Sequence, residues 1–408
     1  MAAVVFCPIT FNLAEVTRMI EVARALPARH TPVFMGYEDD FAHLVAEAGF
    51  EYRSQRPAFT PADRALALRF DQGRTLRNPF TAELVAARVD AERALIRDVQ
   101  AAAVVIGTNP TSMISARAER VPLFYPVPFA LTRPQVEQTA RLGLVRGTGR
   151  ATRALDRVAT TALRWAYNHA PLAPRAFATV ARAHGVPPLR TVVSLLEADR
   201  NLLTVMPWEL EGYTLPAGYE RVGPLFAHLD TPLPDVVHEL AARPEPLVYL
   251  GLGSSASRDL TLAAARRLGD LPVHVVAPVA HYLHEGDALP PNVHVTDLLP
   301  AHRLGGLVDA AVLHGGQGTV QTACATGVPF LGMGLQPEQV WNVDVCVRQG
   351  NAVALSPKQA GTTALPDAVT RLLTEPRFRE AAGRVRDAYA REDGAAASAR
   401  VIAASIDR

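Results

Sequence analysis

The chain has 408 residues, of which 49% are apolar and 20% charged, so it is long enough for two ordinary domains. Its 41 basic and 40 acidic residues leave a formal net charge of +1, which excludes a global field that would hold a nucleic acid or an anionic membrane surface. Almost every basic residue is arginine, and with Lys358 the single lysine, Schiff-base chemistry and a P-loop lysine are disfavoured.

Three cysteines, Cys7, Cys324 and Cys346, are too few and too scattered for a disulfide framework or a four-thiolate zinc site. No cluster of histidine, cysteine and carboxylate residues has ligand spacing, so no metal is expected. The first residues lack the basic region of a signal peptide, and no run approaches the roughly 20 apolar residues of a membrane span. We expect a cytoplasmic protein without stable membrane insertion.

The first half alternates apolar runs with helical periodicity. Strands are predicted at Val4–Pro8 and Thr31–Met35, each followed by a helix, at Ala14–Leu26 and at Asp40–Ala48. Further buried strands are predicted at Ala102–Ile106, Leu123–Val127 and Asn201–Val205. Because strands that alternate with helices form parallel sheets, the sequence predicts an α/β domain over 1–210 whose ligands bind at the carboxyl ends of the strands.

Two segments of this half are less regular. Residues 132–190 are helical and rich in arginine, with Trp165, Tyr167 and His169 close together, and are either an insertion on the acceptor side or further scaffold. Residues 211–233 are rich in proline, glycine and polar side chains, and we place an interdomain linker there.

A second alternating series follows over 234–390. Strands are predicted at residues 246–250, 273–277, 293–295, 310–313 and 328–333, with a helix at 260–268. Residues 366–408 read as amphipathic helix, and 391–408 could dock back on the first half. Two α/β domains joined by a linker would make the cleft between them the natural binding site.

The segment 314–319, His-Gly-Gly-Gln-Gly-Thr, follows the apolar strand 310–313 and opens a helical pattern. Glycines at 315, 316 and 318 let the backbone approach an anion, and the amino terminus of the helix offers unpaired N–H groups. With His314 and Thr319 as additional donors, this pattern is typical of diphosphate binding. The alternative is an ordinary strand-to-helix turn.

Twenty residues further on, Glu338 and Gln339 follow the buried run 329–335. A carboxylate beside an amide offers the acceptors and donors that orient the hydroxyls of a sugar. Helix N-capping is the alternative function of such a pair.

Together these segments resemble the donor-binding signature of nucleotide-sugar-dependent glycosyltransferases with the GT-B fold, the family that includes the antibiotic and macrolide glycosyltransferases. The resemblance covers a region of about 100 residues, 248–342, within which the matching segments are 248–254 (VYLGLGS), 292–304 (NVHVTDLLPAHRL) and the signature 314–342. It implies two Rossmann-like parallel-sheet domains that face a cleft, with the acceptor held by the first half and the donor by the second.

The resemblance also assigns roles to individual residues. His314, Gly316, Gly318 and Thr319 would contact the diphosphate, with Gly315 and Gln317 beside them in the donor site, and Glu338 and Gln339 would hold the hydroxyls of the sugar. The backbone of Thr296, Asp297 and Leu298 would meet the nucleobase, and Gly253 and Ser254 would face the cleft. No metal and no resident cofactor are implied, because the nucleoside-diphosphate sugar is a co-substrate.

In the first half the resemblance is looser and contains one departure. Many relatives carry a Gly-His pair at the start of the first helix, with the histidine as general base, whereas Ala14-Glu15 stands in that place here. Glu15 is therefore the candidate base, the alternative being a first-turn helix charge stabilised by the dipole. We interpret Asn12 as an N-cap and not as a catalytic residue.

Thr108 and Asn109 follow the strand that ends at Ile106, so either side chain could line the acceptor site or orient Glu15, or both could belong to a simple turn.

The resemblance implies an inverting glycosyltransferase that moves a sugar from a nucleoside-diphosphate sugar to a hydroxyl of a small, natural-product-like acceptor. The alternatives are a nucleotide-sugar 2-epimerase, which the Glu-Gln pair disfavours, and a catalytically silent auxiliary protein of the same fold, which the missing histidine favours. The nucleobase, the sugar and the acceptor are selected by the shape of the pocket, which the sequence does not specify. The sequence also does not specify the number of subunits.

Overall fold

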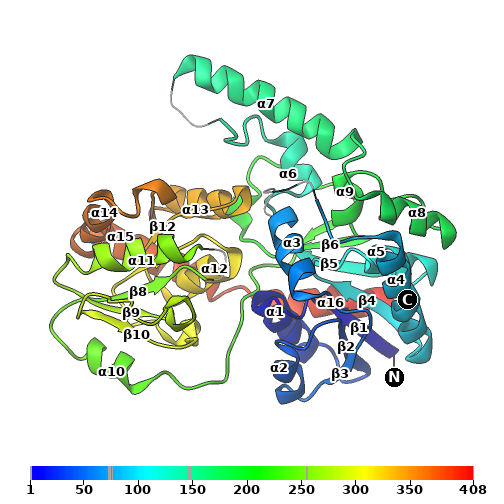
Figure 1. Ribbon diagram of the computed structural model, residues 1–408, viewed down its shortest axis with the longest axis horizontal. Coiled ribbons are helices and arrows are strands. Elements are labelled where there is room, and N and C mark those ends of the chain that lie inside the picture. Colours follow the sequence, from blue (N-terminus) through cyan, green and yellow to red (C-terminus); the bar gives the residue numbers. More distant parts are fainter. Residues whose placement is uncertain (1, 72–74, 76, 146–148, 254–255, 408) are drawn as a thin grey trace. The chain divides into compact units, whose positions relative to one another are not determined.

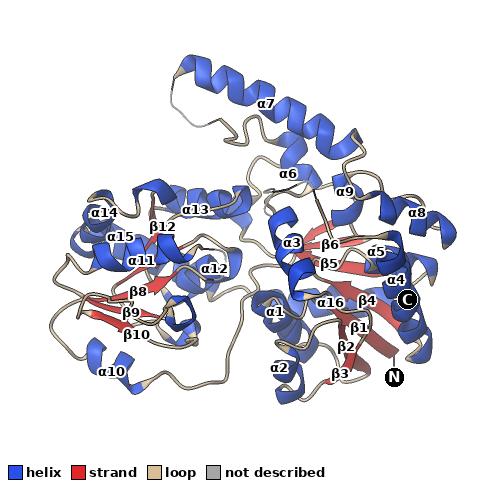
Figure 2. Ribbon diagram, viewed as in Figure 1, coloured by secondary structure: helices blue, strands red, loops and turns tan. Residues whose placement is uncertain are grey.

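The computed structural model describes residues 2–71, 75, 77–145, 149–253 and 256–407 (Figure 1). These residues divide into two units, of which unit 1 comprises Met1–Leu225 with Asp393–Arg408 and unit 2 comprises Phe226–Glu392. In each unit a fully parallel sheet is surrounded by helices (Figure 2). The predicted α/β class with two parallel-sheet domains is therefore confirmed.

The sheet of unit 1 has the order β3-β2-β1-β4-β5-β6-β7. Its strands are β1 (Ala2–Cys7), β2 (His30–Gly36), β3 (Glu51–Ser54), β4 (Ala101–Ile106), β5 (Leu123–Val127), β6 (Arg200–Leu203) and β7 (Tyr219–Arg221). The order reverses between β1 and β4, and ligands of open parallel sheets bind beyond the carboxyl ends of the strands at such a point.

The helices of unit 1 are α1 (Leu13–Arg24), α2 (Ala42–Glu47), α3 (Pro61–Asp71), α4 (Ala82–Asp98), α5 (Ser112–Ala118), α6 (Arg133–Gln138), α7 (Arg150–His169), α8 (Arg175–Ala183), α9 (Val192–Leu196) and α16 (Gly394–Ile406), with a 3₁₀ turn at η1 (Pro207–Glu209). Helix α1 begins because the Asn12 side chain caps the amide of Ala14 at 3.1 Å.

The core of unit 1 explains why its strands are continuously apolar. Val4 and Phe6 of β1 point to one face, where they pack in a single cluster with Ile20 of α1 and Ile402 of α16. Val5, between them, is also fully buried and points to the opposite face. Strands that are covered on both faces lose the alternation of apolar and polar residues, as parallel sheets require.

The sheet of unit 2 has the order β10-β9-β8-β11-β12-β13, and its order reverses between β8 and β11. Its strands are β8 (Leu247–Gly251), β9 (His274–Ala277), β10 (Val293–Val295), β11 (Ala310–Leu313), β12 (Phe330–Gly332) and β13 (Ala352–Ala354). Its helices are α10 (Asp235–Ala241), α11 (Arg258–Leu268), α12 (Gln317–Thr326), α13 (Pro337–Gln349), α14 (Ala364–Thr374) and α15 (Pro376–Tyr389), with 3₁₀ turns at η2 (Ala280–Tyr282), η3 (Ala301–Arg303) and η4 (Pro357–Gln359).

The domain boundaries differ from those that the sequence predicts. The segment 211–233 is not a linker throughout, because Tyr219–Arg221 pairs with β6 as the edge strand β7, and the division between the units falls after Leu225. Three residues flanked by glycine and proline are too few to show a strand pattern. Unit 2 accordingly spans 226–392 and not 234–390.

The carboxyl-terminal segment 366–408 is also not one helical run. Glu375 adopts an extended conformation before Pro376, which separates α14 from α15, and Asp393 caps α16 by accepting from the amide of Ala396 at 2.8 Å. Of these helices only α16 belongs to unit 1, where it packs against α1 and β4. Among the described helices none is long and apolar enough to cross a membrane.

Candidate functional site

The predicted glycine turn lies between β11 and α12, at the point where the strand order of unit 2 reverses. Gly316 is the N-cap of α12, so the first N–H groups of the helix, at Gln317, Gly318 and Thr319, have no intrahelical acceptor. A Cβ at Gly318 would meet no described atom within 4 Å. The amino terminus of a ten-residue helix is therefore open at Gly318, which suits an anion.

His314 is buried behind this turn. A Cβ at Gly316 would lie 2.4 Å from its Nε2 atom, and one at Gly253 would lie 2.9 Å from its Cε1 atom, so both glycines are needed to make room for the ring. The Nδ1 atom lies 3.4 Å from the carbonyl oxygen of Gly251. Since a carbonyl can only accept, the proton of the neutral ring sits on Nδ1. Burial lowers the pKa of His314.

The hydroxyl of Thr319 donates to the carbonyl of Gly316 at 2.9 Å. Gln317 is buried within that turn. The turn thus presents backbone donors and no acidic side chain.

The glycine turn and the Glu-Gln pair lie side by side. Gly315 has a φ of +86°, and a Cβ on it would lie 2.7 Å from the carbonyl oxygen of Gln339. The side chain of Asn342 joins the two segments, because its Nδ2 atom donates to the Gly315 carbonyl at 3.0 Å and to Oε1 of Glu338 at 2.6 Å. The same contact orients the Glu338 carboxylate.

The side chain of Gln339 is buried, and its carbonyl oxygen accepts from the amide of Leu335 at 3.0 Å. The side-chain carbonyl of Gln339 therefore stabilises the start of α13, as expected if the Glu-Gln pair serves in helix N-capping. Its amide nitrogen remains the group that could donate to a ligand.

The other predicted donor contacts follow β8 and β10. Gly253 has a φ of +57° and lies against His314, whereas Ser254 falls outside the described residues. Thr296 is held beside β9 by its amide, which donates to Ala277 at 2.9 Å, and its hydroxyl is buried with no hydrogen-bond partner among the described residues. Asp297 and Leu298 are exposed next to it.

In unit 1, Glu15 lies where the order of β1 and β4 reverses. Its Oε2 atom accepts from the amides of Ile9 at 3.0 Å and Thr108 at 3.1 Å, and its Oε1 atom accepts from the hydroxyl of Thr108. The Nδ2 atom of Asn12 approaches Oε1 at 3.5 Å. A Cβ on Gly107 would lie 1.9 Å from Oε2, so a glycine is required there for the carboxylate to reach the loop.

Glu15 is 4% exposed, and it ties the start of α1 to the loops that follow β1 and β4. Of the two residues predicted to orient it, Thr108 does so and Asn109 does not. The Nδ2 atom of Asn109 instead donates to Glu92 at 3.2 Å and to Ser112 at 3.1 Å.

Glu92 of α4 is the centre of a buried polar network that sequence reasoning missed. Its carboxylate accepts from the hydroxyls of Tyr37 at 2.7 Å, Thr111 and Ser115, as well as from Asn109. Burial and the nearby Glu92 carboxylate raise the pKa of Tyr37. The network fixes the loops after β2 and β4, which border the Glu15 site.

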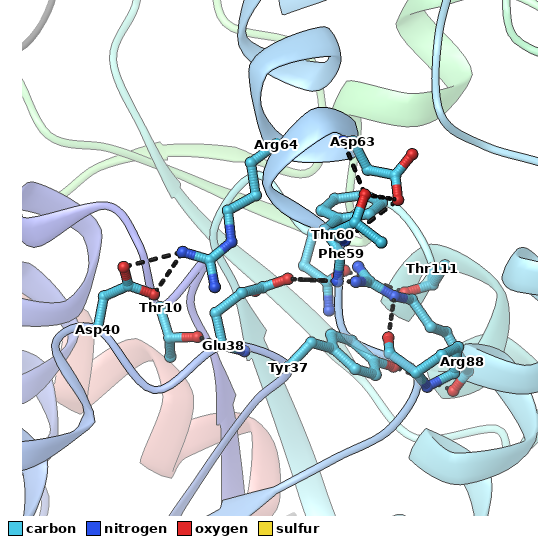
Figure 3. A network of polar contacts seen from close by, with 12 residues as sticks. Thr10, Tyr37, Glu38, Asp40, Phe59, Thr60, Asp63, Arg64, Arg88 and Thr111 are labelled. Carbon is cyan, nitrogen blue, oxygen red and sulfur yellow. Dashed lines mark hydrogen bonds and ion pairs between the residues drawn. The ribbon is translucent and has the colours of Figure 1, made fainter.

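Arg88, one turn before Glu92, extends this network (Figure 3). Its guanidinium lies 3.3 Å from Glu38, donates to the carbonyl of Pro57 at 3.0 Å, and is centred 3.9 Å and 4.0 Å from the rings of Tyr37 and Phe59. No sequence signal could have found these partners, because α4 is separated from Tyr37 and Glu38 by about 50 residues. Asn342 is different, since it stands only four residues after Glu338, the spacing at which side chains meet on one face of a helix such as α13.

Among the described residues no group of three or more histidine, cysteine, aspartate or glutamate side chains could hold a metal ion. Whether the site works without a metal stays a prediction.

Comparison with known proteins identifies one matching family, a related protein of similar length and two solved structures with the same fold. Residues 263–402 match the family described as Erythromycin biosynthesis protein CIII-like, C-terminal domain. The chain is 28% identical to the PGL/p-HBAD biosynthesis glycosyltransferase of Mycobacterium tuberculosis (strain ATCC 25177 / H37Ra) over 385 residues, which cover 93% of this chain and 86% of that protein.

Two solved structures share the fold. The glycosyltransferase VinC in complex with DTDP has 21% sequence identity and a TM-score of 0.70, and the match covers 99% of this chain and 100% of that one. The spinosyn rhamnosyltransferase SpnG complexed with spinosyn aglycone has 18% identity and a TM-score of 0.66, with 99% and 100% covered.

Proposed function

We propose that this chain is a glycosyltransferase with the GT-B fold that moves a sugar with inversion from a nucleoside-diphosphate sugar to a hydroxyl of a small, natural-product-like acceptor. The observation that carries the proposal is the open amino terminus of α12 at Gly318, with His314 behind it and the Glu338 carboxylate beside it. DTDP in the VinC complex and an aglycone in the SpnG complex support the two substrate classes.

The donor is assigned to the carboxyl edge of the sheet of unit 2. The diphosphate meets the amides of residues 317–319 and, once the ring is protonated, His314. Glu338 and the amide nitrogen of Gln339 take the sugar hydroxyls, and Thr296 to Leu298 the nucleobase. Strand β10 lies three strand spacings from β11, about 14 Å, which suits a ligand with its base at one end and its sugar at the other.

The acceptor is assigned to unit 1, at the carboxyl ends of β1 and β4. Its oxygen attacks the anomeric carbon while the bond from that carbon to the diphosphate oxygen breaks, so the nucleoside diphosphate leaves on the opposite face. The acceptor proton passes to a base, which we assign to Glu15. Since the amides of Ile9 and Thr108 hold Oε2, the 3.5 Å contact of Asn12 with Oε1 is the one that an acceptor hydroxyl would replace.

The donor site supplies the charge stabilisation that the leaving diphosphate needs. The first-turn amides of α12 and its dipole are already oriented before the reaction, so no reorganisation is required as negative charge develops. On this proposal the enzyme uses no resident cofactor and no metal.

A second candidate function is that of a silent, donor-binding partner of another enzyme. It is favoured by one observation, the saturation of the Glu15 carboxylate by four donors of the same chain.

One assay tests both candidates. The chain is incubated with uridine- and thymidine-diphosphate sugars, with and without phenolic and alcoholic acceptors, and the free nucleoside diphosphate and the anomeric configuration of the product are measured. Release that depends on the acceptor, with inversion, is expected. Donor binding without release under every condition would favour the silent protein, and retention of configuration would overturn the assigned mechanism.

A further inference from the structure

Helix α7 of unit 1 carries an apolar stripe that no described part of the chain covers. Val158, Trp165 and Leu155 are 66%, 62% and 57% exposed, and Leu172, just beyond the helix, is 56% exposed. Positions 155, 158, 162, 165 and 169 of α7 are spaced alternately by three and four residues, so they share one face of the helix. The opposite face, with Asp156, Thr160 and Tyr167, is buried against unit 1.

The segment that contains α7 is strongly basic. Residues 141–172 include six arginines and a single acidic residue, Asp156. Asp156 is buried, and it accepts from the amides of Gly143 at 3.3 Å and Val145 at 3.0 Å. Asp156 also forms an ion pair with Arg141 at 3.6 Å. The exposed charged residues of α7 itself are all arginines, at 150, 153 and 157.

Two of the arginines stand beside the stripe. Arg150 and Arg157 are exposed, are seven residues apart and therefore lie on the same flank of α7. The described residues form no ion pair with either of them. Figure 1 shows α7 along the outer edge of unit 1, away from its sheet.

We propose that α7 is a docking surface for an anionic lipid membrane. A helix with Leu, Val and Trp on one face and arginines beside it lies in the plane of the headgroups, with the apolar side chains at the acyl boundary and the guanidinium groups at the lipid phosphates. Because no described helix is able to span a membrane, the contact is peripheral. The net charge of +1 is a sum over the chain and conceals this local excess.

Charge complementarity decides between the possible occupants. A second copy packed stripe to stripe would add further arginines to the contact and no exposed acidic side chain, since Asp156 is the single acidic residue of 141–172 and is buried. Phospholipids with net negative charge attract each arginine near the surface and accept the Trp165 side chain at the interface.

The test uses the full chain in sedimentation with vesicles of phosphatidylcholine alone and of phosphatidylcholine mixed with phosphatidylglycerol. Binding to the mixed vesicles, weakened by salt, is expected. The double variant Arg150→Glu/Arg157→Glu should weaken it about tenfold or more. The matched control Arg266→Glu/Arg384→Glu changes two exposed arginines of unit 2 by the same charge and should bind like the wild type.

The apolar part of the surface is tested by Leu155→Ser/Val158→Ser, which should also weaken binding, with circular dichroism to verify the fold. A blue shift of tryptophan emission on the mixed vesicles should disappear in Trp165→Phe. No binding of the wild type to the mixed vesicles would overturn the proposal. The proposal would also be overturned if the wild type formed a stable dimer that Leu155→Ser/Val158→Ser dissociates, since a second copy would then occupy the surface. If both surface variants still bound the membrane like the wild type, the contact would lie elsewhere on the protein.

Discussion

The amide and the hydroxyl of Thr108 both donate to the carboxylate of Glu15, 93 residues earlier in the chain, the amide at 3.1 Å. This pair joins the start of α1 to the loop after β4, where the strand order of unit 1 reverses. Glu15 therefore has two roles to separate, that of an anchor between loops and that of the proposed base.

The substitution Glu15→Gln separates these roles. The amide oxygen can keep the bonds from Ile9 and Thr108, and the amide nitrogen can donate to the Thr108 hydroxyl, so the fold should survive. Loss of the base should lower turnover with an alcohol acceptor about 100-fold or more while donor affinity is kept. Steady-state kinetics and donor titration measure both quantities.

The control for this substitution is Glu21→Gln, on the same helix, which should retain full turnover. If Glu15→Gln lowers the melting temperature but leaves turnover unchanged, Glu15 is only the anchor.

Donor binding should depend on pH through His314. Burial lowers the pKa of His314, so near neutral pH its ring is uncharged and, with the proton on Nδ1, Nε2 can only accept. A bound diphosphate favours the protonated ring, and binding then takes up a proton. Donor affinity should therefore rise as pH falls through the ordinary histidine range, about 6.5, and level off below the lowered pKa of the free protein.

Calorimetric titration of the nucleoside diphosphate across this pH range measures the effect. The variant His314→Ala should bind about 10- to 150-fold more weakly, the equivalent of about 1.5 to 3 kcal/mol for a charge-assisted hydrogen bond, and should lose the pH dependence. If donor affinity changes with pH equally in the wild type and in the variant, a group other than His314 takes up the proton.

Gly318→Ala tests the diphosphate site without disturbing the free protein. The added methyl meets no described atom within 4 Å, and alanine favours a helix over glycine by up to about 1 kcal/mol, so thermal stability should stay constant or rise. Donor affinity should nonetheless fall, because the methyl occupies the space assigned to the phosphate. Thermal melting and donor titration measure the two effects.

The matched control is Gly383→Ala in α15, which is equally unobstructed and should leave donor affinity unchanged. Gly316→Ala should instead displace the His314 ring, since its Cβ would lie 2.4 Å from Nε2. Undiminished donor affinity in Gly318→Ala would refute the position assigned to the phosphate.

The buried network predicts a large stability effect at Glu92. Replacement by alanine leaves the donors of Tyr37, Asn109, Thr111 and Ser115 without their acceptor, and the free energy of unfolding should fall by about 3 to 5 kcal/mol. Urea denaturation measures it. Exposed Glu83 at the start of the same helix is the control, and Glu83→Gln should leave the free energy of unfolding nearly unchanged. A Glu92→Ala protein as stable as the wild type would contradict the central place of this carboxylate.

Much of the fold follows from local patterns. The strands β5, β10 and β11 occur at the residues that the sequence predicts, because a short apolar run bounded by turn residues is a local signal. The resemblance to the glycosyltransferases is confirmed for the same reason, since its motifs are contiguous. The edge strands β3, β7 and β13 were missed for a different reason. Strands β3 (Glu51–Ser54) and β7 (Tyr219–Arg221) are largely polar, and β13 (Ala352–Ala354) consists mostly of alanine, which has a low strand propensity.

The sequence by itself determined the two parallel sheets, the place of the glycine turn between β11 and α12, and the proximity of Glu338 to Gln339, all of which depend on neighbours in the chain. Only the tertiary structure decided that Thr108 and not Asn109 holds Glu15, and that Asn342 joins Glu338 to Gly315. It also decided that Glu92 gathers four donors from the loop after β2, the loop after β4 and α5. The physical reason is that backbone periodicity is set within a few residues, whereas a buried polar atom must find its partner wherever the packed chain places one.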